Sequence, residues 1–480
     1  MKKNQYWLSI LLGLGLALAA LIFNPFSLKE DASKAVAVAI LMITWWITEA
    51  LPMPVVALVP LVLLPLLKIS SIEEVAKSYS NPVVFLFMGG FMIGLAIEKW
   101  KLHKRIALQI VRRTGTSGDR IILGFIIATG FISMWLSNTA TTMMMFPIAL
   151  SVIVVMKDHE KPGPGLQNFS LVLMLVIAYA SNIGGMATII GTPPNVAFIG
   201  IIEKKYGYTV QFLDWMMLCA PLALILLAVL YIVLTKWLYP NRIRNSSETN
   251  TFIQQEISAL GKLTVAEKRV LVVFVITASL WITKDLLNKV GIFKLDDSMI
   301  AILGAIALFA IPSGIVHEQK PKMLMEWEDT SKMAWGILLL FGGGIALAGS
   351  LEKAGVMEQI GNWIAGFSHV GGFTLVLVVV IVSIFLSELM SNVAQVIVLA
   401  PVLASLADAL HLDPLLLGIP MTLAASAAAM MPMGTPPNAI IFSSGLVKLK
   451  DMLKAGLVMN LISIILITLF SWYILPLVMR

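Results

Sequence analysis

The sequence predicts an all-α integral membrane protein with about 11 transmembrane helices in two inverted repeats, and three observations predict it. The chain of 480 residues is 59% hydrophobic and only 13% charged, with a mean hydropathy of +0.91, whereas a soluble domain carries about 25% charged residues. Apolar runs approaching the roughly 20 residues of a membrane span recur along the whole chain. Motifs also recur at a fixed distance, which indicates two copies of one unit.

The charge balance and the cysteine content exclude several classes of protein. The net charge of +7 reflects loop topology, because Lys and Arg collect on the cytoplasmic side of membrane proteins, and it does not indicate nucleic-acid binding. The single cysteine, Cys219, excludes an intrachain disulfide and a cysteine-rich metal site. Met1 and two lysines precede the first apolar run, as in a secretory signal, but we expect an uncleaved helix with a cytoplasmic N-terminus.

The repeat is visible in three pairs of motifs. Leu86-Phe87 recurs as Leu340-Phe341, and Ser137-Asn138 recurs as Ser391-Asn392, in both cases 254 residues later. The pentapeptide GTPPN occurs at 191–195 and again at 434–438, which are 243 residues apart. A polar loop at 157–168, present only in the first copy, accounts for the difference of 11 residues.

The second copy is expected to be inverted in the membrane. Five expected crossings separate the two Ser-Asn motifs, and an odd number of crossings inverts the second copy. Six basic residues follow Lys99 before position 121, whereas none follows Lys353 as far as Thr374, so the two equivalent segments lie on opposite sides. We divide the chain into an N-terminal helix and loop, a first repeat, a cytoplasmic linker and a second repeat, at 1–34, 35–240, 241–268 and 269–480.

Each Ser-Asn motif is expected at the tip of a re-entrant hairpin, at 137–139 and 391–393. The first amides of a returning helix favour anions, and the oxygens of Ser, Thr and Asn can bind a hard cation such as sodium. Polar residues that only hold helices together are the alternative. Matched inverted copies favour a binding site.

The GTPPN segments predict two broken helices, at 191–195 and 434–438. Proline lacks an amide hydrogen and clashes with the preceding turn, and a broken helix at membrane depth must be buried in protein or line a wet cavity. Carbonyl groups freed near Gly191 and Gly434 could then bind cations, as in discontinuous transporter helices. A simple proline kink is the alternative.

These motifs together resemble one family of carriers. Trp46-Ile-Thr-Glu49-Ala-Leu-Pro52, the two Ser-Asn tips and the two GTPPN breaks are similar to the divalent anion:sodium symporter family (DASS or INDY-type carriers), over about residues 35 to 475. The resemblance implies a homodimeric elevator carrier, with a scaffold and a moving transport domain, that couples Na+ to di- or tricarboxylates such as succinate, malate, fumarate or citrate. It implies a multi-pass protein of the plasma (inner) membrane, with the N-terminus in the cytoplasm and the C-terminus outside.

The resemblance also implies the site residues. The first sodium site would be formed by Ser133, Ser137, Asn138 and the backbone of Gly191. The second would be formed by Ser387, Asn392 and the backbone of Met390 and Gly434. Substrate carboxylates would meet Asn138, Thr139, Thr192, Ser391, Asn392, Val393 and Pro436. Val393 stands where a full Ser-Asn-Thr motif has Thr, so one hydroxyl is missing and the preferred acid stays open.

The charges at the tips bear on the alternatives. Segments 133–147 and 387–401 contain no Lys or Arg, and Glu388 is their one ionisable residue, so sodium is expected to offset a dicarboxylate. We interpret Glu388 as a helix-packing acid, with a proton-sensitive group as the alternative. An enzyme is disfavoured because the five histidines are scattered, without a paired carboxylate motif. A channel would need a continuous pore. An exchanger, a proton-coupled carrier and a sulfate carrier of the same fold stay open.

Overall fold

The structure is a computed structural model of the chain, and it describes residues 3–24, 28–115, 117–159, 163–241, 243, 247–291, 294–317, 320–356 and 371–478.

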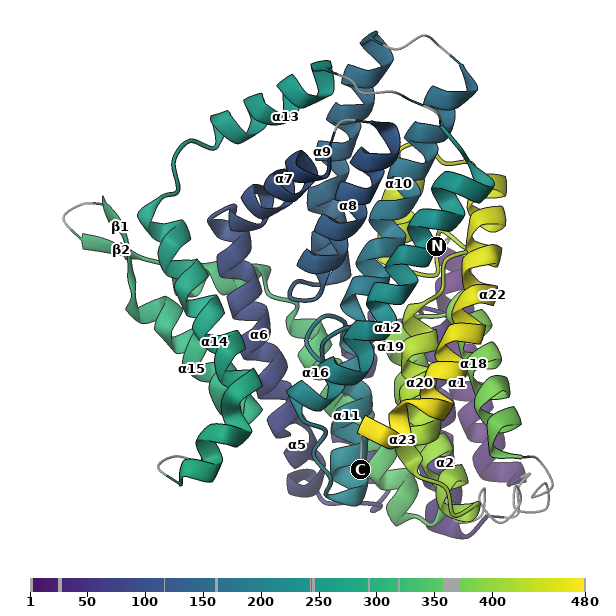
Figure 1. Cartoon of the computed structure of the whole chain (residues 1–480). Helices are drawn as coiled ribbons and strands as arrows, with labels where there is room; N and C mark the ends of the chain where they lie inside the picture. Colours follow the sequence, from purple (N-terminus) through teal and green to yellow (C-terminus); the bar gives the residue numbers. More distant parts are fainter. Residues whose placement is uncertain are drawn as a thin grey trace.

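Helices make up most of the described chain (Figure 1). The N-terminal segment and the first repeat contain α1 (Lys3–Phe23), α2 (Glu30–Ile47), α3 (Met53–Val56), α4 (Val59–Leu66), α5 (Ile72–Tyr79), α6 (Pro82–Lys99), α7 (Leu102–Thr114), α8 (Gly118–Ser133), α9 (Asn138–His159), α10 (Pro164–Gly185), α11 (Pro193–Tyr206) and α12 (Phe212–Ile232), which continues as the π-helix η1 (Val233–Leu238). The linker and second repeat region contain α13 (Ser247–Ala259), α14 (Val265–Val290), α15 (Asp297–Ala310), β1 (Pro312–His317), β2 (Lys320–Met323), the 3-10 helix η2 (Trp327–Lys332), α16 (Trp335–Lys353), α18 (Gly372–Ser387), α19 (Asn392–Ala409), α20 (Pro414–Ser426), α21 (Pro436–Phe442), α22 (Leu449–Tyr473) and α23 (Leu475–Val478).

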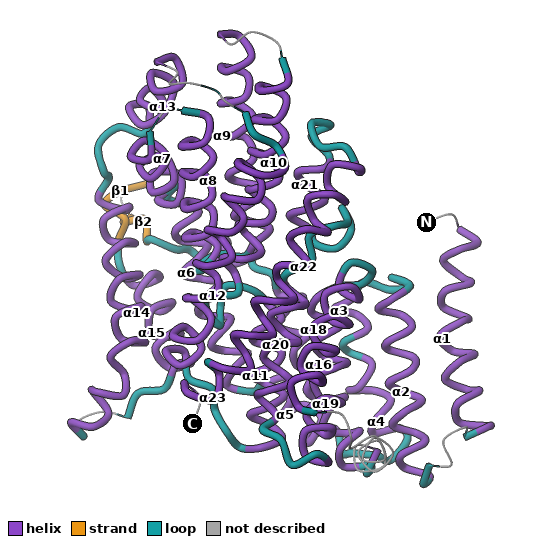
Figure 2. Tube along the Cα trace, turned by 45° about the vertical axis from the view of Figure 1, so that its right-hand side comes forward, coloured by secondary structure: helices purple, strands orange, loops and turns teal. Residues whose placement is uncertain are grey.

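The helices form a bundle around α10. Nearly every side chain of α10 is buried, and the helix packs along α8, α9, α12 and α21. At one edge α15 packs along α6, and at another α18 packs along α20 and α22 (Figure 1). Helix α1 packs along α2 at the periphery of the bundle (Figure 2). Segments from both repeats therefore meet at the centre.

The helix boundaries match the predicted tips and breaks. Helix α8 ends at Ser133 and α9 begins at Asn138, while α18 ends at Ser387 and α19 begins at Asn392, with the predicted offset of 254 residues. Both α8 and α18 have 16 residues, fewer than the roughly 20 that a full crossing needs. The chain therefore turns at both Ser-Asn motifs.

The prolines of GTPPN begin a helix as well as interrupting one. Pro193 and Pro436 are the first residues of α11 and α21, a position where the missing amide hydrogen costs nothing because that amide has no partner within the helix. The helices before them, α10 and α20, end at Gly185 and Ser426. Each repeat thus contains two half-helices joined by an open segment, at 186–192 and 427–435.

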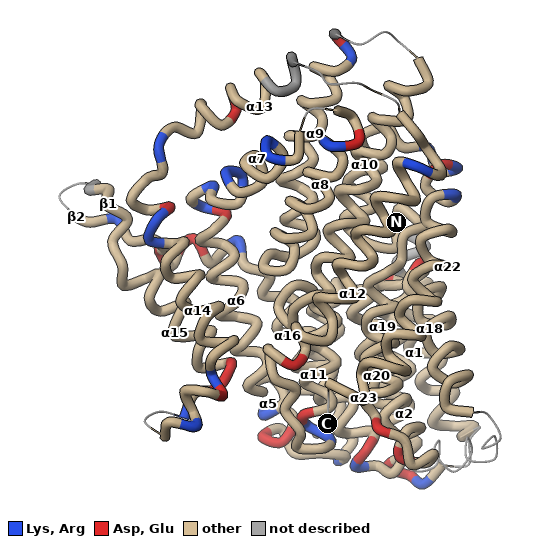
Figure 3. Tube along the Cα trace, in the orientation of Figure 1, with Lys and Arg blue, Asp and Glu red and all other residues tan. Residues whose placement is uncertain are grey.

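Eight helical segments of the described chain are long and apolar enough to cross a membrane, and five shorter apolar helices accompany them. The prediction of about 11 crossings stays a prediction, because the broken and paired helices do not divide into simple spans. Lys, Arg, Asp and Glu gather toward the two ends of the bundle, leaving a central band almost without charge (Figure 3). The antiparallel pair β1 and β2 is a departure from the predicted all-α fold, and it lies in the polar stretch that precedes η2.

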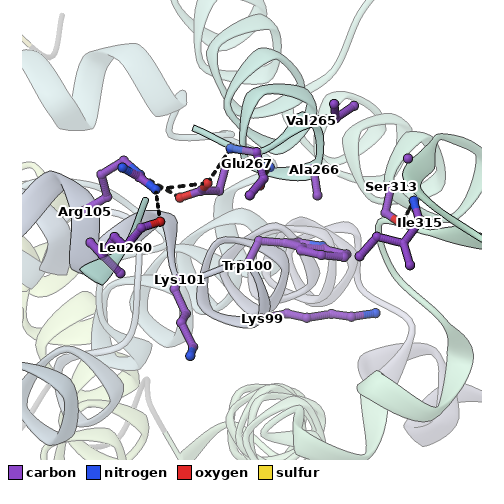
Figure 4. Close-up of a pocket in the computed structure, with 12 residues that line it drawn as sticks. Lys99, Trp100, Lys101, Arg105, Leu260, Val265, Ala266, Glu267, Ser313 and Ile315 are labelled. Carbon is purple, nitrogen blue, oxygen red and sulfur yellow. Dashed lines mark hydrogen bonds and ion pairs between the residues drawn. The ribbon is translucent and has the colours of Figure 1, made fainter. Parts of the chain in front are cut away.

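The cationic helix α7 is anchored to the start of α14. Arg105 Nε donates to Glu267 Oε1 at 2.7 Å, and its Nη atoms donate to the carbonyl oxygens of Gly261 and Leu260 at 2.9 and 3.0 Å (Figure 4). Glu267 also accepts the Thr264 amide at 2.7 Å. A cavity of about 390 Å³ lies beside this ion pair. It contains none of the residues predicted to bind substrate or sodium, so the functional site must be sought at the tips.

Candidate cation and substrate site

The turn between α8 and α9 brings three oxygen atoms together. The hydroxyl of Ser133 lies 2.9 Å from Asn138 Oδ1 and 2.7 Å from the carbonyl oxygen of Ser181. A hydroxyl has one proton and can donate it fully to only one of these acceptors. We call these three atoms the first oxygen cluster. Such a set of hydroxyl, carboxamide and carbonyl oxygens suits a hard cation.

The turn between α18 and α19 repeats this arrangement. The hydroxyl of Ser387 lies 2.5 Å from Asn392 Oδ1 and 2.5 Å from the carbonyl oxygen of Ala425, and these atoms form the second oxygen cluster. Ser133 and Ser387 are both fully buried, so bulk water cannot solvate either cluster from the serine side. The two repeats therefore build the same donor set from equivalent residues.

The returning helices present their first amides at the tips. The hydroxyl of Ser137 accepts a hydrogen bond from the Ala140 amide at 3.3 Å, as a helix-capping residue does. Ser391 is the residue before α19 and makes no such capping bond. Helix N-termini favour negative charge, and α9 and α19 both begin at a Ser-Asn motif.

Asn182 connects the first tip to both broken helices. Asn138 Nδ2 lies 3.4 Å from Asn182 Oδ1 and 3.5 Å from Thr192 Oγ1. Asn182 Nδ2 in turn donates to Thr435 Oγ1 at 3.1 Å, across the boundary between the repeats. Thr192 and Thr435 are the equivalent threonines of the two GTPPN segments, so Asn138 and Asn182 together connect the two breaks to the first tip.

Close backbone packing explains the glycines of the open segments. A side chain at Gly185 would overlap Asn138, and a Cβ at Gly191 would lie 2.5 Å from the Gly185 carbonyl oxygen, so neither position has room for another residue. Gly191 therefore packs on the Gly185 backbone, and Gly185 packs on Asn138 of the first oxygen cluster. A Cβ at Gly434 would lie 2.9 Å from Glu388 Oε2. The roles of Gly191 and Gly434 as sodium ligands stay predictions.

Most of the other predicted site residues are more exposed to solvent than Ser133 and Ser387. Thr139, Met390, Ser391 and Val393 are half-buried and Pro436 is exposed, whereas Thr192 is buried. Partial exposure beside buried oxygen clusters is the arrangement expected where a polar ligand enters from a wet cavity. Their contacts with substrate stay predictions.

Nearly the whole chain matches one known protein family. Residues 3–479 match the family described as the sodium:sulfate symporter transmembrane region. The chain therefore belongs to the sodium:sulfate symporter family. The predicted resemblance to divalent anion:sodium symporters is confirmed, and the chain is a member of a transporter family and not an enzyme.

Relatives of this symporter carry a more specific name. The sodium-dependent dicarboxylate transporter SdcS of Staphylococcus saprophyticus is 38% identical, covering 96% of this chain and 89% of the relative. SdcS of Staphylococcus aureus is also 38% identical, covering 100% of this chain and 94% of the relative. Among solved structures, the YdaH transporter of Alcanivorax borkumensis has a TM-score of 0.55 and 12% identity, covering 83% of this chain and 87% of that one. This last likeness concerns the fold alone.

Sequence reasoning missed three residues at or beside the two oxygen clusters. Ser181 and Ala425 contribute backbone carbonyls, which any residue type could provide, so their side chains gave no signal. Asn182 did give a signal in the sequence, because it is a polar residue within the apolar helix that precedes the predicted break at 191–195. In membrane helices such a residue commonly bonds across helices.

Asn182→Ala is expected to reduce uptake of labelled succinate about tenfold. The substitution removes the hydrogen bonds of Asn182 to Thr435 and to Asn138, which belong to a buried network. The measurement is initial uptake in proteoliposomes at matched protein content. Asn168→Ala is the matched control, since Asn168 lies at the other end of the same helix and bonds only the Pro240 carbonyl oxygen. Equal uptake by the two variants would contradict a role for Asn182 in the site.

Proposed function

We propose that this protein is a sodium-coupled symporter for dicarboxylates, such as succinate, malate or fumarate, that works by an elevator mechanism. The observation that carries the proposal is the repeated oxygen cluster, with the same three kinds of oxygen at both tips. Neutral oxygen clusters beside two helix N-termini can hold a cation and an anion together. The staphylococcal relatives, named as sodium-dependent dicarboxylate transporters, support the same cargo.

Sodium is proposed as the coupled ion because the site lacks another source of positive charge. The tip segments 133–147 and 387–401 and the break segments 181–195 and 424–438 contain no Lys, Arg or His. Bringing a dicarboxylate to such a place without a counter-charge would be strongly unfavourable. Two sodium ions would supply that charge, one at each oxygen cluster. A dicarboxylate exchanger would instead need a fixed basic group.

Sulfate and citrate are the alternative cargoes. The family description names sulfate, whereas the SdcS relatives are named for dicarboxylates. Thr139 at the first tip is matched by Val393 at the second, so the pocket offers one hydroxyl where a symmetric pocket would offer two. Fewer hydrogen-bond donors favour a ligand whose charge is concentrated in two carboxylates over one with further polar groups.

The elevator proposal rests on unequal exposure of equivalent residues. In the first repeat, Ile190 is 6% exposed and packs on Gly90 of α6, while Gly200 of α11 packs on Ile345 of α16. Their equivalents in the second repeat, Met433 and Ser443, are exposed, Met433 by 71%. One copy of the same surface is thus covered by neighbouring helices and the other is bare.

Inverted repeats that exchange these environments would produce two end states. In the opposite state Met433 would pack on Gly344, the equivalent of Gly90, and Ser443 would pack on Phe91, the equivalent of Ile345. With the N-terminus in the cytoplasm, α21 lies in the cytoplasmic half of the membrane, so its bare face corresponds to an inward-facing state. The hairpins and broken helices would move together as the transport domain, past a scaffold that includes α6, α14, α15 and α16.

We place the protein in the bacterial plasma membrane as a homodimer with its C-terminus outside. Exposed apolar side chains cover the outer faces of α14 and α15, including Leu303 and Ile306 at 56% and 58%, and such faces meet lipid or a second copy of the scaffold. An elevator needs a scaffold that does not move with the cargo, and a dimer interface would hold it.

Replacing external sodium by choline is expected to abolish succinate uptake into proteoliposomes, because no other charge offsets the two carboxylates. Uptake is measured with an inward sodium gradient, with choline at pH 7.5, and with choline at pH 5.5. Addition of unlabelled malate, citrate or sulfate ranks the cargoes. Continued uptake in choline at pH 5.5 would instead support proton coupling, and uptake only against internal dicarboxylate would support exchange.

Cysteines at Ser443 and Phe91 are expected to cross-link under mild oxidation, although Ser443 is exposed in this conformation. The pair is made in a Cys219→Ser background and compared with the equivalent pair at Gly200 and Ile345, which are in contact here. Sodium and substrate should shift the balance between the two cross-links, because they shift the populations of the end states. Cross-linking of the second pair alone, under every condition, would contradict the elevator.

A further inference from the structure

Glu388 is a buried acid with no basic partner, one residue from the second oxygen cluster. It is 4% exposed, and in the described part of the chain none of the ion pairs includes it. A carboxylate in the centre of a membrane protein is costly unless its oxygens are fully bonded. Its surroundings therefore indicate what it does.

Every hydrogen bond to Glu388 comes from a neutral N–H group. Oε1 accepts the amides of Ala429 and Met430 at 2.9 and 2.8 Å and Asn460 Nδ2 at 2.7 Å, and Oε2 accepts the Met431 amide at 2.8 Å. An ionised carboxylate only accepts hydrogen bonds, whereas the protonated form must donate one. Within the described part of the chain, four N–H groups donate to these two oxygens, and a charged carboxylate can accept all of them.

The three amides belong to the open segment between α20 and α21. They follow the last turn of α20 and have lost their helical partners, so the carboxylate replaces the missing hydrogen bonds. Asn460 of α22 and Tyr179 of α10 secure the same place: Asn460 Oδ1 accepts the Ala429 amide at 3.2 Å, and the Tyr179 hydroxyl donates to the Ala429 carbonyl oxygen at 2.7 Å. Glu388 thereby holds the backbone at 429–431, between Ala425, whose carbonyl belongs to the second oxygen cluster, and Gly434.

The first repeat lacks this charge. The residue equivalent to Glu388 is Met134, and there the open segment is held by the Thr188 hydroxyl, which donates to the Met134 carbonyl oxygen. The two oxygen clusters therefore have the same ligand types but different electrostatic surroundings. Glu388 follows Ser387 of the second cluster directly in the chain, and a fixed negative charge near a poorly solvated site favours a bound cation.

We propose that Glu388 is a positioning residue for the second cation site: it holds the open backbone in place and supplies negative charge that the first site lacks, so that the second site binds sodium more tightly. The inference rests on the proposed sodium coupling. It assigns the two sites unequal affinity although their ligands are equivalent. The second site then fills first as the sodium concentration rises.

The test is succinate uptake by proteoliposomes as a function of sodium concentration. Glu388→Gln keeps the shape of the side chain and removes its charge, and we expect the half-saturating sodium concentration to rise roughly tenfold, with the succinate KM at saturating sodium changed less than about threefold. Glu267→Gln is the matched control, because Glu267 is also 4% exposed and also accepts a backbone amide, but it lies at the anchor of α7. The control should lower thermal stability without moving the half-saturating sodium concentration.

Glu388→Asp separates charge from folding. The variant retains the charge but has a side chain that is one methylene group shorter. We therefore expect a lower Tm, with a half-saturating sodium concentration within about threefold of that of the unaltered protein. An unchanged sodium dependence in Glu388→Gln, the same shift in Glu267→Gln, or an Asp variant shifted tenfold would overturn the proposal. If Glu388→Gln does not insert into the membrane, the half-saturating sodium concentration of Glu388→Asp alone decides between these outcomes. Sodium-independent uptake by the unaltered protein would instead refute the proposed function itself.

Discussion

A helix broken inside a membrane must find new partners for its freed backbone groups, and this constraint governs the centre of the protein. Each unpaired amide or carbonyl in an apolar surrounding costs roughly 2–7 kcal/mol, and each repeat opens its helix over several residues. Polar side chains meet the need. Asn195 Nδ2 donates to the Thr188 carbonyl oxygen at 2.9 Å, and Asn438 Nδ2 donates to the Met431 carbonyl oxygen at 3.0 Å. The asparagine side chain of each GTPPN motif therefore bonds a free carbonyl group of the open segment that precedes it.

The same constraint ties the hairpins to the broken helices. Ser133 and Ser387 stand at the ends of α8 and α18 and reach the last turns of α10 and α20. The side chains that bond the freed backbone groups also bring oxygen atoms together, so the structural role and the proposed cation-binding role belong to the same residues. The second repeat uses a carboxylate, Glu388, where the first uses a hydroxyl, and this is the main chemical difference between copies of otherwise matched design.

The sequence predicted the parts of this arrangement that depend on residue type and spacing. The tips and breaks follow from proline chemistry and from motifs repeated at constant distance, and their positions agree with the helix ends at Ser133, Asn138 and Pro193. The carbonyls of Ser181 and Ala425 could not be predicted, because a backbone oxygen leaves no trace in residue identity. Glu388 was interpreted as a helix-packing acid, with a proton-sensitive group as the alternative, and its four N–H partners, three of them backbone amides, could not be read from residue type.

Tertiary context decided the remaining differences. The polar stretch after α15 forms the strands β1 and β2, with the Ser313 hydroxyl donating to the Lys322 carbonyl oxygen at 2.8 Å. The segment predicted as a cytoplasmic linker contains α13, which packs against α7 and α9. Neither stretch has the apolar periodicity from which such elements are predicted.

The central claim is that each oxygen cluster holds one sodium ion, and equilibrium binding of ²²Na+ to purified protein tests it most directly. Ser133→Ala and Ser387→Ala each remove one cluster's hydroxyl while leaving the other cluster intact. The account predicts that each variant loses one bound ion per chain and that the double variant loses both. Single variants that bind as many sodium ions as the unaltered protein would contradict it.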